Sequence, residues 1–133
     1  MNGLRVDHTA VAVRDMDEAL ERYRRIYGVG PAERHTVSEQ GVEVAFLPVG
    51  DTELELVAPL NAESGVARFL DRHGEGLHHI GMLVEDIEAE LLGLAADGVR
   101  LIDQHARSGP HGLIAFIHPE QTGLLVELVQ RRR

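Results

Sequence analysis

Residues 77–94, "LHHIGMLVEDIEAELLGL", repeat the pattern of residues 7–23, "DHTAVAVRDMDEALERY". When His79 is set against His8, each histidine is followed by an apolar run, and then by an aspartate at the same offset. An apolar run that ends at a helix-capping residue is typical of a strand leading into a helix. The two stretches therefore predict the same strand–helix unit twice in one chain.

The two aspartates, Asp15 and Asp86, are predicted N-caps, because their carboxylates can accept hydrogen bonds from the free N–H groups of a first helical turn. Gly28 and Gly98 are the predicted stops. Apolar residues recur between these limits at the three-and-four spacing of an amphipathic helix. They are Met16, Ala19, Leu20, Tyr23, Ile26 and Tyr27 in the first segment, and Ile87, Leu91, Leu94 and Ala95 in the second.

The likeness of the two halves continues downstream. Residues 42–59, "VEVAFLPVGDTELELVAP", predict two strands joined at Gly50-Asp51, and residues 113–130, "LIAFIHPEQTGLLVELVQ", predict two strands joined around residues 119–123. Each second strand carries a glutamate followed by Leu-Val. Glu55 lies 47 residues after His8, and Glu127 lies 48 residues after His79.

The predicted fold class is α+β. One strand–helix–strands unit has a single open sheet and cannot bury its apolar face alone, so two units are expected to pair into one curved mixed sheet. We expect a single domain over residues 1–133, made of modules at about 4–60 and 75–130. Apolar residues at helical spacing predict a short connecting helix over residues 64–74.

Composition excludes several functions. The formal net charge of −9 would repel a phosphate backbone, so no nucleic acid is expected as a partner. The absence of cysteine excludes disulfides and thiol nucleophiles. No apolar run approaches the roughly 20 residues that span a bilayer, and no targeting segment is evident, which predicts a cytoplasmic protein without a membrane partner. The terminal Arg131–Arg133 run is expected to be solvated.

Four polar residues match between the halves: His8, Glu55, His79 and Glu127. Taken singly, each is more often a structural or surface residue than a ligand. As matched pairs on apolar strand faces they predict a metal site, because a buried carboxylate is costly unless paired or ligated. Two imidazoles and two carboxylates suit cobalt, manganese, nickel, iron or zinc. A six-coordinate ion would keep two positions for a bidentate oxygen substrate.

The remaining histidines are expected to have other roles. His78 aligns with Asp7 instead of His8, so it should point to the opposite face of its strand and be structural or support a ligand. The other five have no repeat partners and are predicted to be mostly solvated: His35, His73, His105, His111 and His118.

At these residues the chain resembles the vicinal oxygen chelate (glyoxalase/bleomycin resistance/dioxygenase) superfamily, and within it the methylmalonyl-CoA epimerase family. The stretches that carry the resemblance are "DHTAVAVRDMDEAL", "SEQGVEVAFLPVGDTELELVAPL", "GEGLHHIGMLVEDIEA", "GVRLID" and "HPEQTGLLVEL". The segment "LIDQHARSGPHGLIAF", residues 101–116, departs from the epimerase pattern, and some epimerases have glutamine in place of Glu55.

The resemblance implies a glyoxalase-like fold of paired βαβββ modules around one divalent metal ion, with cobalt favoured. It implies that His8, Glu55, His79 and Glu127 are the ligands, that Glu39 is a general base, and that Glu127 also faces the substrate from the other side. The implied activity interconverts (2R)- and (2S)-methylmalonyl-CoA, by C2 proton abstraction with enolate stabilisation. The implied partners are an acyl-CoA substrate and a second copy in a homodimer.

Alternative functions stay open at this point. A glyoxalase I-type isomerase (lactoylglutathione lyase) shares the ligand pattern and the metal chemistry. A non-catalytic ligand-binding module of the same fold typically lacks the full ligand set, whereas all four positions are filled here. A ring-cleaving dioxygenase would need two histidines and one carboxylate on iron. Nothing in the sequence identifies the residues that hold the CoA phosphates, and the Arg22, Arg24 and Arg25 cluster is equally explained by an exposed helix face.

Overall fold

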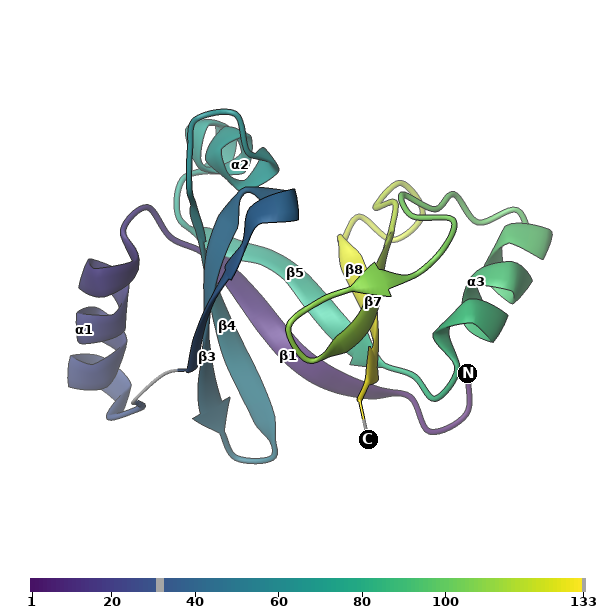
Figure 1. The fold of residues 1–133 in the computed structure, drawn as a ribbon, viewed down its shortest axis with the longest axis horizontal. Coiled ribbons are helices and arrows are strands. Elements are labelled where there is room, and N and C mark those ends of the chain that lie inside the picture. The colour runs from purple at the N-terminus through teal and green to yellow at the C-terminus, as the bar shows by residue number, and fades with distance from the viewer. Residues whose placement is uncertain (31–32, 133) are drawn as a thin grey trace. The chain divides into compact units, whose positions relative to one another are not determined.

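The computed structural model describes residues 1–30 and 33–132 of the chain. Within these residues the elements follow the order strand, helix and three strands, twice over, with one helix between the two sets (Figure 1). The fold divides into two compact units, His8–His78 and Met1–Asp7 together with His79–Arg133. Both boundaries fall inside a strand, immediately before His8 and immediately before His79.

The first set of elements builds the sheet of the first unit. They are β1 (Arg5–Ala12), α1 (Met16–Tyr27), β2 (Glu33–Val37), β3 (Val42–Val49) and β4 (Thr52–Pro59). A 3₁₀ turn, η1 (Ser38–Gln40), joins β2 to β3, and α2 (Gly65–His73) follows β4. The strand order is β2-β3-β4-β1, with β1 and β4 parallel and the other pairs antiparallel.

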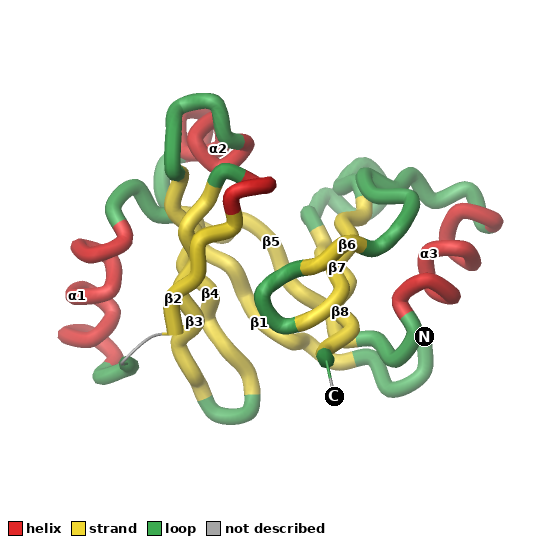
Figure 2. Tube along the Cα trace, viewed as in Figure 1, coloured by secondary structure: helices red, strands yellow, loops and turns green. Residues whose placement is uncertain are grey.

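The second unit repeats this topology. Its elements are β5 (Gly76–Leu83), α3 (Ile87–Ala96), β6 (Arg107–Ser108), β7 (Gly112–Ile117) and β8 (Val126–Arg131). The strands β5, β8, β7 and β6 lie in this order (Figure 2). Again the first strand pairs with the last in parallel, while the other pairs are antiparallel. The predicted α+β class and its internal repeat are confirmed.

Both repeat helices begin and end where the sequence predicts. The Asp15 carboxylate accepts a hydrogen bond from the N–H of Glu18 at 2.9 Å, and Asp86 accepts one from Ala89 at 3.2 Å. Gly28 ends α1 in the left-handed region, with φ of 68°, and donates its N–H to the Arg24 carbonyl. Glycine adopts this conformation without the steric penalty of a β-carbon, so the helix stops cleanly.

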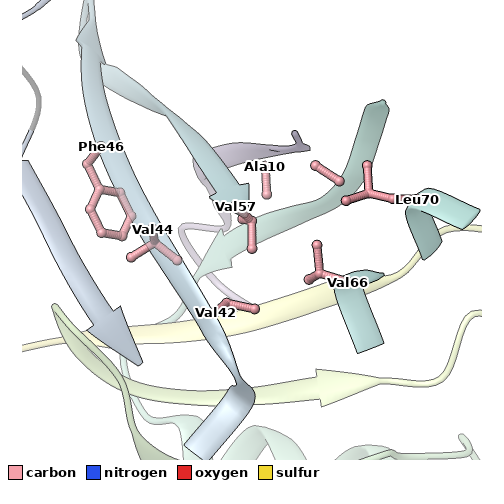
Figure 3. Close-up of a cluster of buried hydrophobic side chains, with 8 residues drawn as sticks. Ala10, Val42, Val44, Phe46, Val57, Val66 and Leu70 are labelled. Atoms are coloured by element: carbon pink, nitrogen blue, oxygen red, sulfur yellow. The ribbon is translucent and has the colours of Figure 1, made fainter. Parts of the chain in front are cut away.

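The two faces of the first sheet pack against different helices. Alternate residues of β3 and β4, such as Leu47 and Leu56, are fully buried and pack with Met16 and Ala19 of α1. The opposite alternation forms a second cluster against α2, in which strand and helix side chains point toward one another (Figure 3). Its members are Ala10, Ala12, Val42, Val44, Phe46, Val57, Val66 and Leu70. A strand in a sheet that is covered on both faces has an almost continuous apolar sequence, as residues 42–49 do.

The second unit has the equivalent helix-side core. Ile87 and Leu91 of α3 are completely buried against Ala115 of β7 and Leu128 of β8. These two helix residues stand in the repeat positions of Met16 and Leu20 of α1. The face of each sheet that carries the matched glutamates is therefore the face that α1 or α3 does not cover.

The sequence pattern missed the edge strands. No element was predicted between Gly28 and residue 42, but Glu33–Val37 pair with β3 as an edge strand, and Ser38–Gln40 form η1. The chain lacks an apolar alternation there because an edge strand is half solvated and commonly carries charged side chains. Among the described helices, none combines the length and the apolar character needed to cross a membrane.

Truncation of the helix-side core should destabilise the fold. Leu56→Ala is expected to lower the free energy of unfolding by about 3 kcal/mol, because Leu56 is 0% exposed and its removal leaves a cavity. Leu60→Ala is the control, since Leu60 is 48% exposed, and it should change stability by less than about 0.5 kcal/mol. Urea unfolding followed by circular dichroism measures both, and equal losses would contradict this description of the core.

Candidate functional site

The first unit places one histidine and one glutamate side by side on the sheet. In the parallel pairing of β1 with β4, Ala10 is opposite Glu55. His8 lies two residues before Ala10 and so projects from the same face as Glu55. The His8 Nε2 atom is 3.3 Å from the Glu55 Oε1 atom, and both side chains are buried.

The second unit reproduces this pair. In the parallel pairing of β5 with β8, Gly81 is opposite Glu127, and His79 lies two residues before Gly81. The His79 Nε2 atom is 3.8 Å from the Glu127 Oε1 atom, and both side chains are again buried. The nearly equal sequence separations of the two pairs therefore reflect an identical strand register in the two halves.

A phenylalanine lies beside each His/Glu pair, and neither phenylalanine is among the site residues predicted from the sequence. Phe46 on β3 is opposite Glu55, and Phe116 on β7 is opposite Glu127. The Phe46 ring lies edge-on to His8, with centroids 6.4 Å apart, and the Phe116 ring lies edge-on to His79 at 5.3 Å. Both follow an alanine in their strands, which is a repeat signal that the sequence offers. Apolar rings beside each pair strengthen its electrostatic interactions.

The donor atoms of the pairs fit a divalent cation. Two ligand atoms that lie about 2.0–2.2 Å from an ion at angles near 90–110° are separated by about 2.8–3.6 Å. The first pair falls within this range and the second lies slightly beyond it. Buried carboxylates at such distances from imidazole nitrogens need a proton or a cation to offset their desolvation. His8, Glu55 and His79 are each buried and of types that could hold a metal ion.

Comparison with known proteins identifies the family. The model of the Glyoxalase/Bleomycin resistance protein/Dioxygenase superfamily matches residues 7–116. The chain belongs to this superfamily. The resemblance deduced from the two His/Glu repeats is thereby confirmed at the level of the superfamily.

Individual relatives cover almost the whole chain. The Bacillus subtilis protein YqjC is 42% identical over 95% of this chain and 91% of its own length. An ethylmalonyl-CoA/methylmalonyl-CoA epimerase of Cereibacter sphaeroides is 36% identical over 95% of this chain and 97% of its own length. A solved methylmalonyl-CoA epimerase in complex with methylmalonyl-CoA and NH4+ is 35% identical, with a TM-score of 0.89 over 96% of this chain and 94% of that one. These figures confirm the glyoxalase-like fold.

Glu39 is the residue that the family resemblance predicts to be a general base. It lies in η1, between β2 and β3, and its side chain is exposed. The turn ends at Gly41, whose φ of 68° favours glycine, and a β-carbon there would come within 3.1 Å of the Ser64 side chain. Glycine at position 41 therefore allows the turn that carries Glu39 to end in a left-handed conformation close to Ser64. The catalytic role of Glu39 stays a prediction.

The other histidines divide into two groups. The His78 ring packs edge-on to Phe69 of α2, with centroids 4.9 Å apart, in accordance with a structural role. Of the five unmatched histidines, His73 and His105 are exposed and the others are half-buried, and His35 lies within β2. Its Nε2 atom is 2.7 Å from Glu33, and its ring faces Phe46 at 6.1 Å.

The basic tail is also more ordered than predicted. The Arg131 guanidinium donates to both carboxylate oxygens of Asp7, through Nε at 2.7 Å and Nη2 at 3.2 Å. The expectation that this arginine is solvated is wrong, because the buried Asp7 needs a cation and β8 supplies it. Asp7 immediately precedes His8, so this bidentate pair fixes the strand at the residue before a predicted ligand. Arg133 lies outside the described residues.

Two cavities adjoin the repeat helices, and neither is lined by a residue of the two His/Glu pairs. One, of about 510 Å³, is lined by α1, the residues after it and Leu47, and the other, of about 410 Å³, lies beside α3. Four residues of each are repeat equivalents: Asp17, Leu20, Glu21 and Arg24 in the first, and Glu88, Leu91, Leu92 and Ala95 in the second. Each cavity therefore adjoins the sheet face that α1 or α3 covers, and not the face that carries Glu55 or Glu127.

Loss of the bidentate pair should destabilise the fold. Arg131→Leu is expected to lower the free energy of unfolding by about 1–2 kcal/mol, since it leaves the buried Asp7 carboxylate without its guanidinium. The loss is smaller than for a fully buried pair because the Arg131 side chain is 37% exposed. In the double variant Asp7→Asn/Arg131→Leu, part of this loss should be recovered. Urea unfolding in the presence of a chelator tests this, and an additive double variant would contradict it.

Proposed function

We propose that both His/Glu pairs hold a single divalent cation, through His8, Glu55, His79 and Glu127. The support comes from each unit taken separately, because each buries one imidazole and one carboxylate at the same register position. Two carboxylates would neutralise the charge of the ion, and an octahedral ion would keep two positions for substrate oxygens. Cobalt is the ion we favour from the family resemblance.

We propose further that the protein is an epimerase that interconverts (2R)- and (2S)-methylmalonyl-CoA. The observation that carries this proposal is the matched pair of buried His/Glu sites, in a chain 36% identical to a named ethylmalonyl-CoA/methylmalonyl-CoA epimerase over nearly its whole length. The complete four-residue ligand set favours an enzyme over a non-catalytic binding module of the same fold.

The reaction requires a base on each face of C2. The C2 proton lies between a thioester and a carboxylate, so its removal places charge on the thioester oxygen. The bound cation would supply Lewis-acid stabilisation of that charge. Glu39 removes the proton from one face through its carboxylate, and Glu127 returns a proton from the other face. An exposed carboxylate such as Glu39 can exchange its proton with water between turnovers.

The two carboxylates differ in their suitability as bases. A carboxylate that is bound to a cation is a weak base, because the ion stabilises its unprotonated form. As a residue that would also hold the ion, Glu127 would therefore be the weaker base of the two. Glu39, which is not among the predicted ligands, has no such competition and is the firmer assignment.

Glu39→Gln should separate proton transfer from metal binding. We expect the cobalt content to equal that of the wild-type protein, and exchange of the C2 proton to slow by at least about 100-fold, the usual contribution of a positioned base. Glu63→Gln, which changes another exposed loop carboxylate, is the control and should exchange at the wild-type rate. Turnover of Glu39→Gln at the wild-type rate would remove Glu39 from the mechanism.

The adjacent histidines provide a matched test of the ligand assignment. His79→Ala should lose both bound cobalt and activity, because an imidazole ligand is removed. His78→Ala should keep bound cobalt, since His78 packs on Phe69. Metal content after dialysis, measured by plasma emission spectrometry, distinguishes the two variants. Retention of one equivalent of cobalt by His79→Ala would contradict the assignment.

Proton NMR in D2O tests the proposed reaction. Cobalt-loaded protein should abolish the C2–H signal of (2R)- and (2S)-methylmalonyl-CoA and form the other epimer, whereas chelated protein should not. The glutathione–methylglyoxal hemithioacetal, assayed in parallel, tests the glyoxalase I-type alternative. Exchange of neither thioester epimer by folded, metal-loaded protein would overturn the epimerase proposal.

Two finer properties belong to the same proposal. We propose that the protein forms a homodimer and that it is cytoplasmic. Light scattering at micromolar concentration and cell fractionation test these properties one by one.

A further inference from the structure

Arg107 provides a permanent positive charge on the same face of the second sheet as Glu127. In the antiparallel pairing of β6 with β7, Arg107 is opposite Ile114, and Phe116 lies two residues further along β7. Phe116 is in turn opposite Glu127. Because paired and alternate residues share a face, Arg107, Phe116 and Glu127 all project from the same side of this sheet.

The position of the guanidinium is defined by its contacts. Its central carbon lies 5.9 Å from the centre of the Phe116 ring, a cation–π contact, and that ring centre lies 5.3 Å from the centre of the His79 imidazole. These two contacts place the Arg107 charge within about 11 Å of His79. A charged group at this distance is within reach of an acyl group bound at the His79/Glu127 pair.

The Arg107 guanidinium contacts one carboxylate and has further N–H groups that can donate hydrogen bonds. Its Nε atom is 3.4 Å from the Asp103 carboxylate, which also accepts a 2.8 Å hydrogen bond from the N–H of Phe116. The Asp103 carboxylate is thus shared between the Arg107 side chain and the Phe116 backbone. By contrast, Arg131 donates to Asp7 through two nitrogens at 2.7 and 3.2 Å. The terminal nitrogens of Arg107 are therefore suited to a further acceptor.

The internal repeat breaks at this position. The residue of the first half in the same register is His35, which is opposite Val44, two residues before Phe46. His35 has a carboxylate partner of its own, Glu33, at 2.7 Å. The two halves thus share the His/Glu/Phe arrangement but differ in charge at the adjacent edge strand. Such a difference suits an asymmetric substrate, because a local positive charge favours binding of its anionic end.

We propose that Arg107 binds the free carboxylate of the acyl group, and so selects malonyl-type thioesters over acyl-CoA molecules without that carboxylate. This inference rests on the proposed function. A guanidinium matches a carboxylate in shape and charge, and a carboxylate has enough lone pairs to serve a cation and Arg107 together. The CoA phosphates are a poorer match, because the whole pantetheine arm separates them from the thioester.

Calorimetric binding tests the inference without relying on turnover. Malonyl-CoA and propionyl-CoA are the probes, because the first has the free carboxylate and the second lacks it. We expect Arg107→Leu to weaken malonyl-CoA binding by about 10- to 100-fold, the range for losing a charged hydrogen-bond partner, and to change propionyl-CoA binding less than about twofold. Arg107→Lys should keep part of the preference. Thermal unfolding confirms that each variant is folded.

Arg100→Leu is the matched control, since Arg100 belongs to the same unit but is exposed and paired with Glu120. It should leave both affinities unchanged. An equal loss for the two thioesters in Arg107→Leu, or no loss for malonyl-CoA, would overturn the inference while leaving the epimerase proposal intact. Failure of the wild-type protein to bind either thioester would instead overturn the proposed function, and this inference with it.

Discussion

The parallel pairing of the first strand with the last strand in each half is the constraint on which the candidate site depends. It fixes Ala10 opposite Glu55 and Gly81 opposite Glu127, so that each histidine, two residues earlier, projects from the same face as its glutamate. A shift of one residue in either register would turn the glutamate toward the face that α1 or α3 covers, where an unpaired carboxylate is costly. The core packing that holds the register therefore also holds the site.

The buried His/Glu pairs lie on one face of each sheet only. The face toward α1 or α3 buries aliphatic side chains and supplies much of the free energy of folding. The opposite face carries the His/Glu pairs, which oppose folding unless a proton or a cation compensates them, and in the first unit it also packs an apolar cluster against α2. A cation that binds only the folded chain would stabilise it in proportion to the logarithm of its concentration over its Kd. Occupancy of the proposed site would for that reason be linked to the stability of the fold.

The sequence predicted the repeat, the helix caps and the His/Glu pairs, because each is encoded by local pattern or by fixed spacing. It did not reveal β2 and β6, which are edge strands too polar or too short to show an apolar alternation. It also missed the pairing of Asp7 with Arg131, residues 124 positions apart, and the contact between Arg107 and Phe116. Such contacts depend on which strands become neighbours and on their register. No window of the sequence contains that information.

In the proposed site the two His/Glu pairs hold one cation and do not form two separate sites. Titration of chelated protein with Co²⁺, followed by visible absorption and X-ray absorption spectroscopy, distinguishes the two arrangements. We expect saturation at one cobalt ion per chain, with two imidazole nitrogens among its ligands. Saturation at two ions per chain, each with a single imidazole, or the absence of stoichiometric binding would contradict it.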